Sequence, residues 1–175
     1  AAAFFARAFV DIKESEYDRI VDVDQKGQYF LVQAAARSMI RGKKGGKVVT
    51  VASVAYRGED MPKLAMMTAY NTAKAGVVGM TRGIAKELKQ YGINVNCIAP
   101  GLVYTKIMDR YSERDIRGFE RKIPAGRGGT VDDIVPMIQF LADKKKSSFI
   151  VGQTIFIDGG QSIDGVIDCM LEDEI

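Results

Sequence analysis

The ten residues Gly92-Ile-Asn-Val-Asn-Cys-Ile-Ala-Pro-Gly101 decide the fold class of this chain. Gly92 stands where a preceding helix would be capped, because glycine readily adopts the left-handed conformation that ends many helices. Residues 93–98 form a short run rich in Ile and Val, which indicates a buried strand. The Pro100-Gly101 pair then breaks that strand. The stretch therefore predicts a strand that directly follows a helix, an order typical of α/β proteins.

The same alternation continues on both sides of this stretch. Apolar residues recur with the 3.6-residue period of a helix, and short β-branched runs separate these periodic segments. Thr130 and Asp133 have the spacing of a capping box for a third helix, which we expect to bend at Pro136. We expect helices over residues 14–39, 66–91 and 130–141, and strands over residues 47–52, 93–98 and 154–158. This order predicts a parallel sheet covered by helices on both faces.

Two polar stretches lie outside these elements. Residues 53–64 contain Gly58, Pro62 and several charges, and predict a loop. Residues 103–128 are polar and poorly periodic, which is typical of a flexible lid.

Composition excludes several classes of protein. The chain has 175 residues and a mass of 19.2 kDa, which suits one domain, and 47% hydrophobic residues exclude wholesale disorder. A net charge of +3 does not indicate a nucleic-acid partner, and no apolar stretch is long enough to predict a membrane span. With Cys97 and Cys169 as the only cysteines and no histidine, we expect neither a disulfide framework nor a metal site. The sequence does not favour secretion, so we expect a cytoplasmic protein.

Tyr70 and Lys74 are the first candidates for chemistry. They lie four residues apart in a predicted helix, so both side chains project from one face. A lysine ammonium stabilises a nearby phenolate and lowers a pKa that is otherwise about 10. A chain without histidine could obtain a general acid–base in this way. The alternative is an ordinary solvated helix face, which the pair in isolation favours.

Residues that follow the first two predicted strands would lie near this pair. Ser53 ends the first strand, and ligands of open α/β sheets bind outside the carboxyl ends of the strands. Its hydroxyl could polarise a substrate carbonyl, although a loop serine usually bonds to nearby backbone. In residues 100–105, Gly101 would allow close approach of a flat ligand and Thr105 could bond to an amide. A simple turn is the alternative for that segment.

Four segments together resemble the short-chain dehydrogenase/reductase family. Lys47-Val-Val-Thr-Val-Ala-Ser53 is similar to its strand that leads to the catalytic serine, and Tyr70-Asn-Thr-Ala-Lys74 to its YxxxK helix. The stretch that ends at Pro100-Gly101 and the segment Ile155-Phe-Ile-Asp-Gly-Gly160 resemble two later strands. The resemblance covers about residues 10–162, in the order of the family. It implies the C-terminal portion of a doubly wound, Rossmann-like parallel sheet, as one partial domain over residues 1–175 with a tail over 163–175.

The resemblance also implies an activity and a set of roles. The complete protein would be an NAD(P)-dependent oxidoreductase that interconverts a secondary alcohol and a ketone, with NAD or NADP as cofactor. Tyr70 would be the general acid–base, Lys74 would lower its pKa and hold the nicotinamide ribose, and Ser53 would orient the carbonyl. The nicotinamide would be lined by Pro100, Gly101, Val103 and Thr105. Members of the family commonly form dimers or tetramers, so we expect a homodimer or homotetramer through the helices at 14–39 and 66–91.

The sequence departs from the family pattern at three places. Asp24 stands where the family usually has the asparagine of its catalytic tetrad, and a carboxylate there would disfavour the tyrosinate and could bind Lys74. The alternative is that Asp24 turns aside as an ordinary helix residue. Ser53 and Tyr70 are also a few residues further apart than usual, which predicts an enlarged loop over residues 57–64.

The third departure concerns the cofactor-binding half of the family. No glycine-rich fingerprint follows a first strand, so we expect these residues alone neither to bind the dinucleotide normally nor to turn over. Sheet edges would also be left exposed. These points keep open a second hypothesis, a truncated, non-catalytic member that acts as an interaction or structural module.

Overall fold

Three parallel strands form the centre of the computed structural model, which describes residues 2–58, 67–106 and 108–163. The strands are β1 (Gly46–Val51), β2 (Ile93–Pro100) and β3 (Thr154–Ile157), in that order across the sheet. In the register, Val51 pairs with Ile98, and Pro100 pairs with Ile157. The carboxyl ends of β1 and β2 therefore lie side by side, which brings Ser53 and the Pro100-Gly101 turn to one edge of the sheet.

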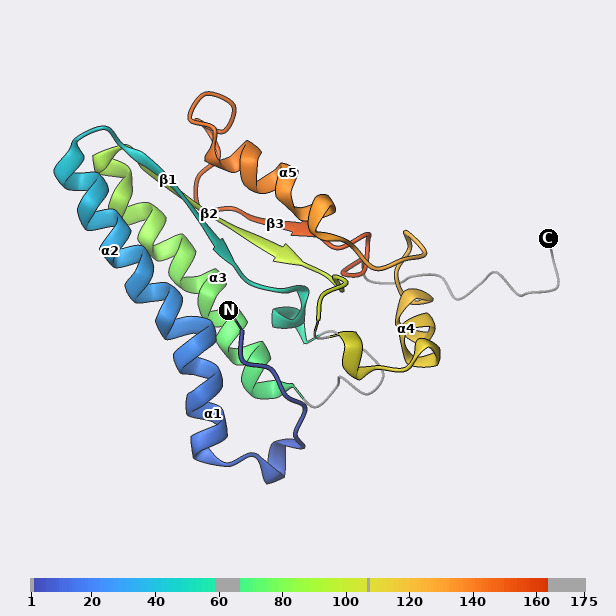
Figure 1. The fold of residues 1–175 in the computed structure, drawn as a ribbon. Coiled ribbons are helices and arrows are strands. Elements are labelled where there is room, and N and C mark those ends of the chain that lie inside the picture. The colour runs from blue at the N-terminus through green and yellow to red at the C-terminus, as the bar shows by residue number, and fades with distance from the viewer. Residues whose placement is uncertain (1, 59–66, 107, 164–175) are drawn as a thin grey trace.

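Helices cover both faces of this sheet (Figure 1). A long helical run and α3 (Thr68–Leu88) lie against one face, while α5 (Val131–Ala142) lies on the other. The long run consists of α1 (Glu14–Val21), a π turn (Asp22–Lys26) and α2 (Gly27–Gly42). The expected parallel α/β architecture with helices on both faces is confirmed.

Small residues on α3 allow the long helical run to approach it closely. Ala69 and Ala73 pack with Ile20 of α1 in one buried cluster. At Gly76 a Cβ atom would lie 2.5 Å from the end of the Gln25 side chain, so the glycine lets this side chain of the π turn pack directly on α3. This contact places the π turn directly beside the part of α3 that carries Tyr70 and Lys74.

One cluster of the core lies between the helices and β2. Ala36, Ala85 and Leu88 pack with Ile93 and Val95 of this central strand. Cys97 is fully buried with Ala52 and Val77, so its thiol is part of the core. The apolar residues Ile93, Val95, Cys97 and Ile98 of this strand are all buried, which explains why the sequence alone indicated a buried strand here.

The structure differs from the expected elements at two places. The helix expected over residues 14–39 contains the π turn, a feature that is frequent at functional sites and that a hydrophobic period does not reveal. The stretch expected to be a lid without regular structure contains α4 (Glu113–Glu120). Ser112 and Asp115 form a capping box at its start. This helix was not predicted because the apolar residues of the stretch do not recur with a clear helical period. The capping box at Thr130 and Asp133 is present as expected, with Pro136 inside α5.

Several expectations concern residues outside the described part. They are most of the enlarged loop at 57–64, the start of the 66–91 helix, Cys169 and the tail. Among the described residues, no helix has the length and apolar character that crossing a membrane requires.

Candidate active site

Ser53 marks the place where β1 ends and the candidate site begins. It is extended, with φ −167° and ψ 153°, and it precedes a 3-10 turn (Val54–Arg57). Its Oγ accepts a hydrogen bond of 3.3 Å from the backbone amide of Ala55. The local role considered from the sequence is therefore present. This hydrogen bond uses only a lone pair of Ser53 Oγ, so the hydroxyl proton stays available for another acceptor.

Tyr70 and Lys74 come from successive turns near the start of α3. Tyr70 is half-buried, whereas Lys74 is only 3% exposed. The Lys74 Nζ lies 5.4 Å from the centre of the Tyr70 ring and 3.4 Å from the carbonyl oxygen of Val51. The helix thus aims the lysine at the end of β1, and the solvated-face alternative is wrong for Lys74.

Asp24 turns into the site rather than away from it. Its side chain is fully buried, and Oδ1 lies 3.0 Å from Lys74 Nζ. Oδ2 accepts a hydrogen bond of 2.8 Å from the amide of Ala3. Oδ1 has no hydrogen-bond partner among the described residues, so its contact with Lys74 is an ion pair without hydrogen-bond geometry. Of the two interpretations of Asp24, the structure supports direct pairing with Lys74.

The π turn that carries Asp24 is tied to the end of β1 by Gln28. The Gln28 amide nitrogen donates to the carbonyl oxygen of Asp24 at 2.8 Å and to that of Val51 at 3.0 Å. Its amide oxygen accepts from the backbone amide of Val51 at 3.0 Å. This one side chain therefore fixes the helix against the strand, and it fixes Asp24 relative to the carbonyl group that Lys74 also contacts.

The electrostatics of the site differ from the expectation for Tyr70. Burial raises the pKa of Tyr70 to about 12, the Asp24 carboxylate contributes in the same direction, and a hydrogen bond with Ser53 opposes them. The sequence predicted that Lys74 would lower this pKa. In the structure burial is the largest cause of the raised pKa of Tyr70, and the Lys74 charge is paired with Asp24.

The segment after β2 lies beside Ser53, one strand away. The amide of Ala52 donates to the carbonyl oxygen of Ile98 at 2.8 Å, so the two strand ends are joined immediately before both turns. Val103 is half-buried, in a bridge with Gly129, and Thr105 is exposed.

The need for glycine at position 101 comes from the protein itself. A Cβ atom there would lie 2.8 Å from the Asp158 Cβ and 2.9 Å from its Cα. The expectation that this glycine serves the approach of a flat ligand therefore gains no support from the structure. Close packing against the turn after β3 accounts for it.

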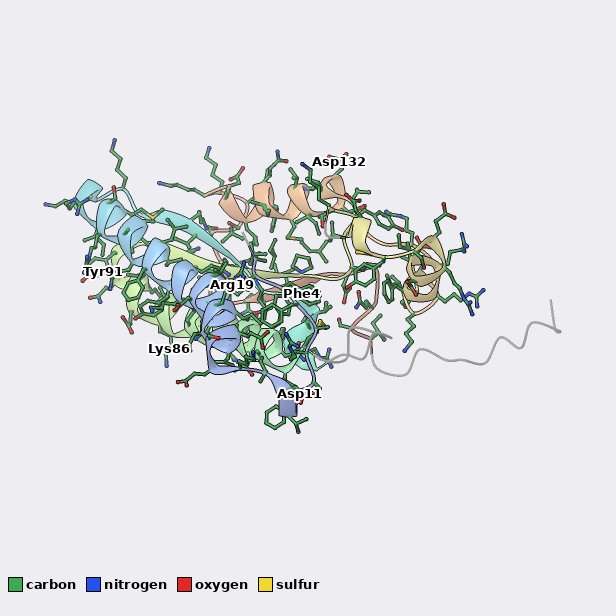
Figure 2. The ribbon with its side chains drawn as sticks, turned by 60° about the horizontal axis from the view of Figure 1, so that its bottom comes forward. Phe4, Asp11, Arg19, Lys86, Tyr91 and Asp132 are labelled. Atoms are coloured by element: carbon green, nitrogen blue, oxygen red, sulfur yellow. The ribbon has the colours of Figure 1, made fainter. Side chains whose placement is uncertain are left out.

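An apolar cluster beside Tyr70 was not recognised from the sequence. Phe4 meets the Tyr70 ring edge-on, with ring centres 5.4 Å apart, and Tyr111 meets Phe119 in the same way at 5.3 Å. Figure 2 shows Phe4 against the body of the molecule, whereas Asp11 lies at its outer rim. What we call the apolar cluster consists of buried Ala55, Met67, Met108 and Phe119, with Phe4, Tyr70, Leu102, Tyr111 and Ile116 packed against them.

Tyr104 connects the segment after β2 to two later parts of the chain. Its hydroxyl donates to Glu120 of α4 and accepts from the backbone amide of Gly128 at 2.9 Å. The hydrogen bond with Glu120 raises the pKa of Tyr104. The Arg127 guanidinium pairs with Asp133 at 2.8 Å and holds the pKa of that carboxyl well below its usual range. These contacts hold α4 near the candidate site.

Together these groups lie at the carboxyl edge of the sheet, and their chemistry suits proton transfer. The site combines a half-buried phenol, a hydroxyl group hydrogen-bonded to it, and a buried ammonium–carboxylate pair. The described residues contain no group of side chains arranged to hold a metal ion.

Comparison with known proteins places this chain in a family. The family model described as enoyl-(acyl carrier protein) reductase matches residues 1–162. The chain is 40% identical over 158 residues to the (2S)-[(R)-hydroxy(phenyl)methyl]succinyl-CoA dehydrogenase subunit BbsD of Thauera aromatica, covering 90% of this chain and 61% of that protein. The chain thus spans about three fifths of the length of that relative.

Solved structures agree in fold as well as in sequence. A short-chain dehydrogenase of Leptospira borgpetersenii with bound NAD+ matches with a TM-score of 0.85 and 30% identity. The match covers 93% of this chain and 63% of that chain. A putative 2-deoxy-d-gluconate 3-dehydrogenase of Agrobacterium tumefaciens with bound NADP matches with a TM-score of 0.83 and 32% identity. The match covers 92% of this chain and 64% of that chain. On the extent of these matches, the chain belongs to the short-chain dehydrogenase/reductase family.

Proposed function

We propose that the full-length protein is an NAD(P)-dependent oxidoreductase that interconverts a secondary alcohol and a ketone by hydride transfer. The observation that carries the proposal is the meeting of Ser53, Tyr70 and Lys74 at the carboxyl end of β1. These residues come from two separate segments, and a structural role alone does not require a phenol, a hydroxyl and a buried ammonium at one place.

Tyr70 would move the proton in this reaction. With a pKa of about 12, it is a neutral phenol near pH 7 and can donate its proton to the oxygen of a carbonyl that is being reduced. Ser53 would hydrogen-bond to the same oxygen, where negative charge develops in the transition state. In the oxidative direction the phenolate would accept the alcohol proton. The raised pKa therefore makes reduction the direction better suited to neutral pH.

Lys74 and Asp24 would set the charge and position of the groups around Tyr70. The Lys74 ammonium has three hydrogens, and its ion pair with Asp24 leaves it able to donate to a cofactor hydroxyl. Asp24 would act as a positioning residue, since it contacts Lys74 and not the Tyr70 hydroxyl. The four residues proposed as catalytic machinery are thus Ser53, Tyr70, Lys74 and Asp24.

NAD or NADP would supply the hydride, and the residues present fit its nicotinamide end. A buried ammonium and a phenol lie at the end of β1, and Thr105 is exposed in the segment after β2. Related structures with NAD+ and with NADP support either form of the cofactor. The residues that would line the nicotinamide are Pro100, Gly101, Val103 and Thr105.

The test is a hydride-transfer assay of the full-length protein with NADH or NADPH and a panel of ketones. We expect turnover, seen as loss of reduced nicotinamide, with a balanced yield of alcohol. A folded protein that binds neither cofactor and turns over no ketone would contradict the proposal and would support the non-catalytic module instead.

We also propose a homodimer or homotetramer of single-domain subunits, located in the cytoplasm. Aromatic and aliphatic side chains on the long helical run support the assembly, because Phe30 and Leu31 of α2 are 55% and 71% exposed. Light scattering of the full-length protein should give at least twice the subunit mass. A monomer at micromolar concentration would contradict it, and cell fractionation tests the location.

A further inference from the structure

We infer that the substrate of this site carries an apolar, bulky substituent on its reacting carbon, and is not a polyol. The inference rests on the proposed function, because it assumes that a carbonyl carbon reacts beside Tyr70. It concerns the apolar cluster beside Tyr70, which the part of the substrate away from the carbonyl oxygen would contact.

The apolar cluster lies directly beside Tyr70, which packs against its buried residues. Ala55 lies two residues after Ser53, and Met67 lies three residues before Tyr70, so both flank the groups that would hold the carbonyl oxygen. Tyr70 itself packs against the cluster, and Phe4 covers an edge of its ring. A substituent on a carbonyl carbon bound at Ser53 and Tyr70 would therefore contact apolar side chains.

The helix α4 presents its apolar residues to the same place. Ile116 and Phe119 lie three residues apart on one face, and both belong to the apolar cluster. Arg114 and Arg117 lie on the exposed side of this helix. Tyr111, just before α4, adds an aromatic ring against Phe119. The helix thus contributes hydrocarbon rather than hydrogen-bonding groups to the surroundings of Tyr70.

The buried polar groups of the described residues offer little to additional hydroxyl groups. Asp24 and Lys74 pair with each other. Thr50 of β1 and Thr81 of α3 share a hydrogen bond of 2.7 Å. The remaining buried polar side chains, Asn96 and Ser147, bond to backbone groups near the opposite end of β3. Hydroxyl groups of a polyol that lay against the apolar cluster would lose their bonds to water, whereas an alkyl or aryl group gains by leaving water.

The experiment compares ketones of different polarity with the full-length protein and its preferred nicotinamide cofactor. The probes are acetophenone, cyclohexyl methyl ketone and hydroxyacetone for reduction, and a hexitol for oxidation. We expect kcat/KM for the two apolar ketones to exceed that for hydroxyacetone by about ten-fold or more. Equal or better use of hydroxyacetone, or efficient oxidation of the hexitol, overturns the inference while the proposed function stands. Failure to turn over any probe overturns both.

A pair of substitutions on α4 assigns the preference to the apolar cluster. Ile116→Asn should lower kcat/KM for acetophenone by about ten-fold and leave that for hydroxyacetone nearly unchanged. Arg114→Asn places the same side chain on the exposed side of the helix and should change neither value. Equal losses for both ketones in Ile116→Asn overturn the assignment. If that variant does not fold, Ile116→Ala takes its place, and the comparison of ketones with the unaltered protein tests the inference without any variant.

Discussion

Replacing Tyr70 with phenylalanine is expected to lower kcat for ketone reduction by about 10²- to 10⁴-fold, the range that a positioned general acid contributes. The substitution removes only the hydroxyl group and keeps the ring that meets Phe4 edge-on and packs against the apolar cluster. The fold should therefore survive, and the loss should appear in kcat rather than in cofactor affinity. Steady-state kinetics and circular dichroism of the full-length variant check both parts.

The rates of reduction and oxidation should depend on pH in opposite ways, because they use different protonation states of Tyr70. A pKa raised to about 12 means that Tyr70 keeps its proton through neutral and mildly alkaline pH. Reduction, which uses the phenol, should be independent of Tyr70 ionisation up to about pH 10 and should decline toward pH 12. Oxidation, which uses the phenolate, should rise over the same interval. Tyr70→Phe should abolish both dependences.

A matched substitution separates the role of Tyr70 from a general effect of losing a phenol. Tyr29 of α2 is 43% exposed and its ring meets Phe30, so Tyr29→Phe removes a hydroxyl group at the surface. Its kcat should stay within about two-fold of the unaltered protein. Retention of most of the activity by Tyr70→Phe would refute its assignment as the general acid–base.

Substitution of Asp24 should have the largest effect on stability and should also move the pH profile. Asp24→Ala leaves the Lys74 ammonium buried without its carboxylate, and removal of one partner of a buried pair typically costs about 3–5 kcal/mol. Asp24→Asn should cost less, because the amide oxygen can still accept a hydrogen bond from the ammonium. Urea unfolding of the full-length variants measures both free energies.

The same substitutions test whether Asp24 acts on Tyr70. The Asp24 carboxylate is one of the groups that raise the pKa of Tyr70, so its removal in Asp24→Asn should lower that pKa. The rise of the oxidation rate should then occur at lower pH than in the unaltered protein. A purely structural role would lower stability without moving the profile.

Two controls isolate the pair from other effects. Asp22 lies in the same π turn and pairs with Lys26 at the surface, so Asp22→Asn should leave both the free energy of unfolding and the pH profile nearly unchanged. In Asp24→Asn combined with Lys74→Met, neither charge remains, so the loss of stability should be smaller than the sum of the single losses. Strict additivity would show that the two groups do not interact.

The expected elements followed from local patterns that the structure retains. The strand over residues 93–98 is β2, and the helix before it along the chain, α3, is the one that the apolar period predicted. Burial of whole strands and of one face of each helix produces these patterns, so they are readable without a structure. The weakly periodic stretch was the exception. Its helix α4 is short and mostly exposed, and only two of its residues join the apolar cluster.

The candidate site was predictable in its residue types and not in its electrostatics. The spacing of Tyr70 and Lys74 in one helix and the place of Ser53 after a strand are properties of the sequence. The pKa of Tyr70 depends on burial and on a charge from a segment far away in the chain. Phe4 lies in an irregular segment, where no period indicates what a side chain will contact.

The sequence by itself determined the order of helices and strands, the parallel α/β class and the residues that meet at the carboxyl end of β1, because short-range periodicity and strand–turn residues encode them. Only the tertiary structure decided that Asp24 pairs with Lys74 and that the pKa of Tyr70 is raised rather than lowered. The reason is geometric, because the direction of Asp24 depends on a π turn fixed by Gln28 and by close packing at Gly76. Contacts between distant segments set that direction, and no local pattern specifies them.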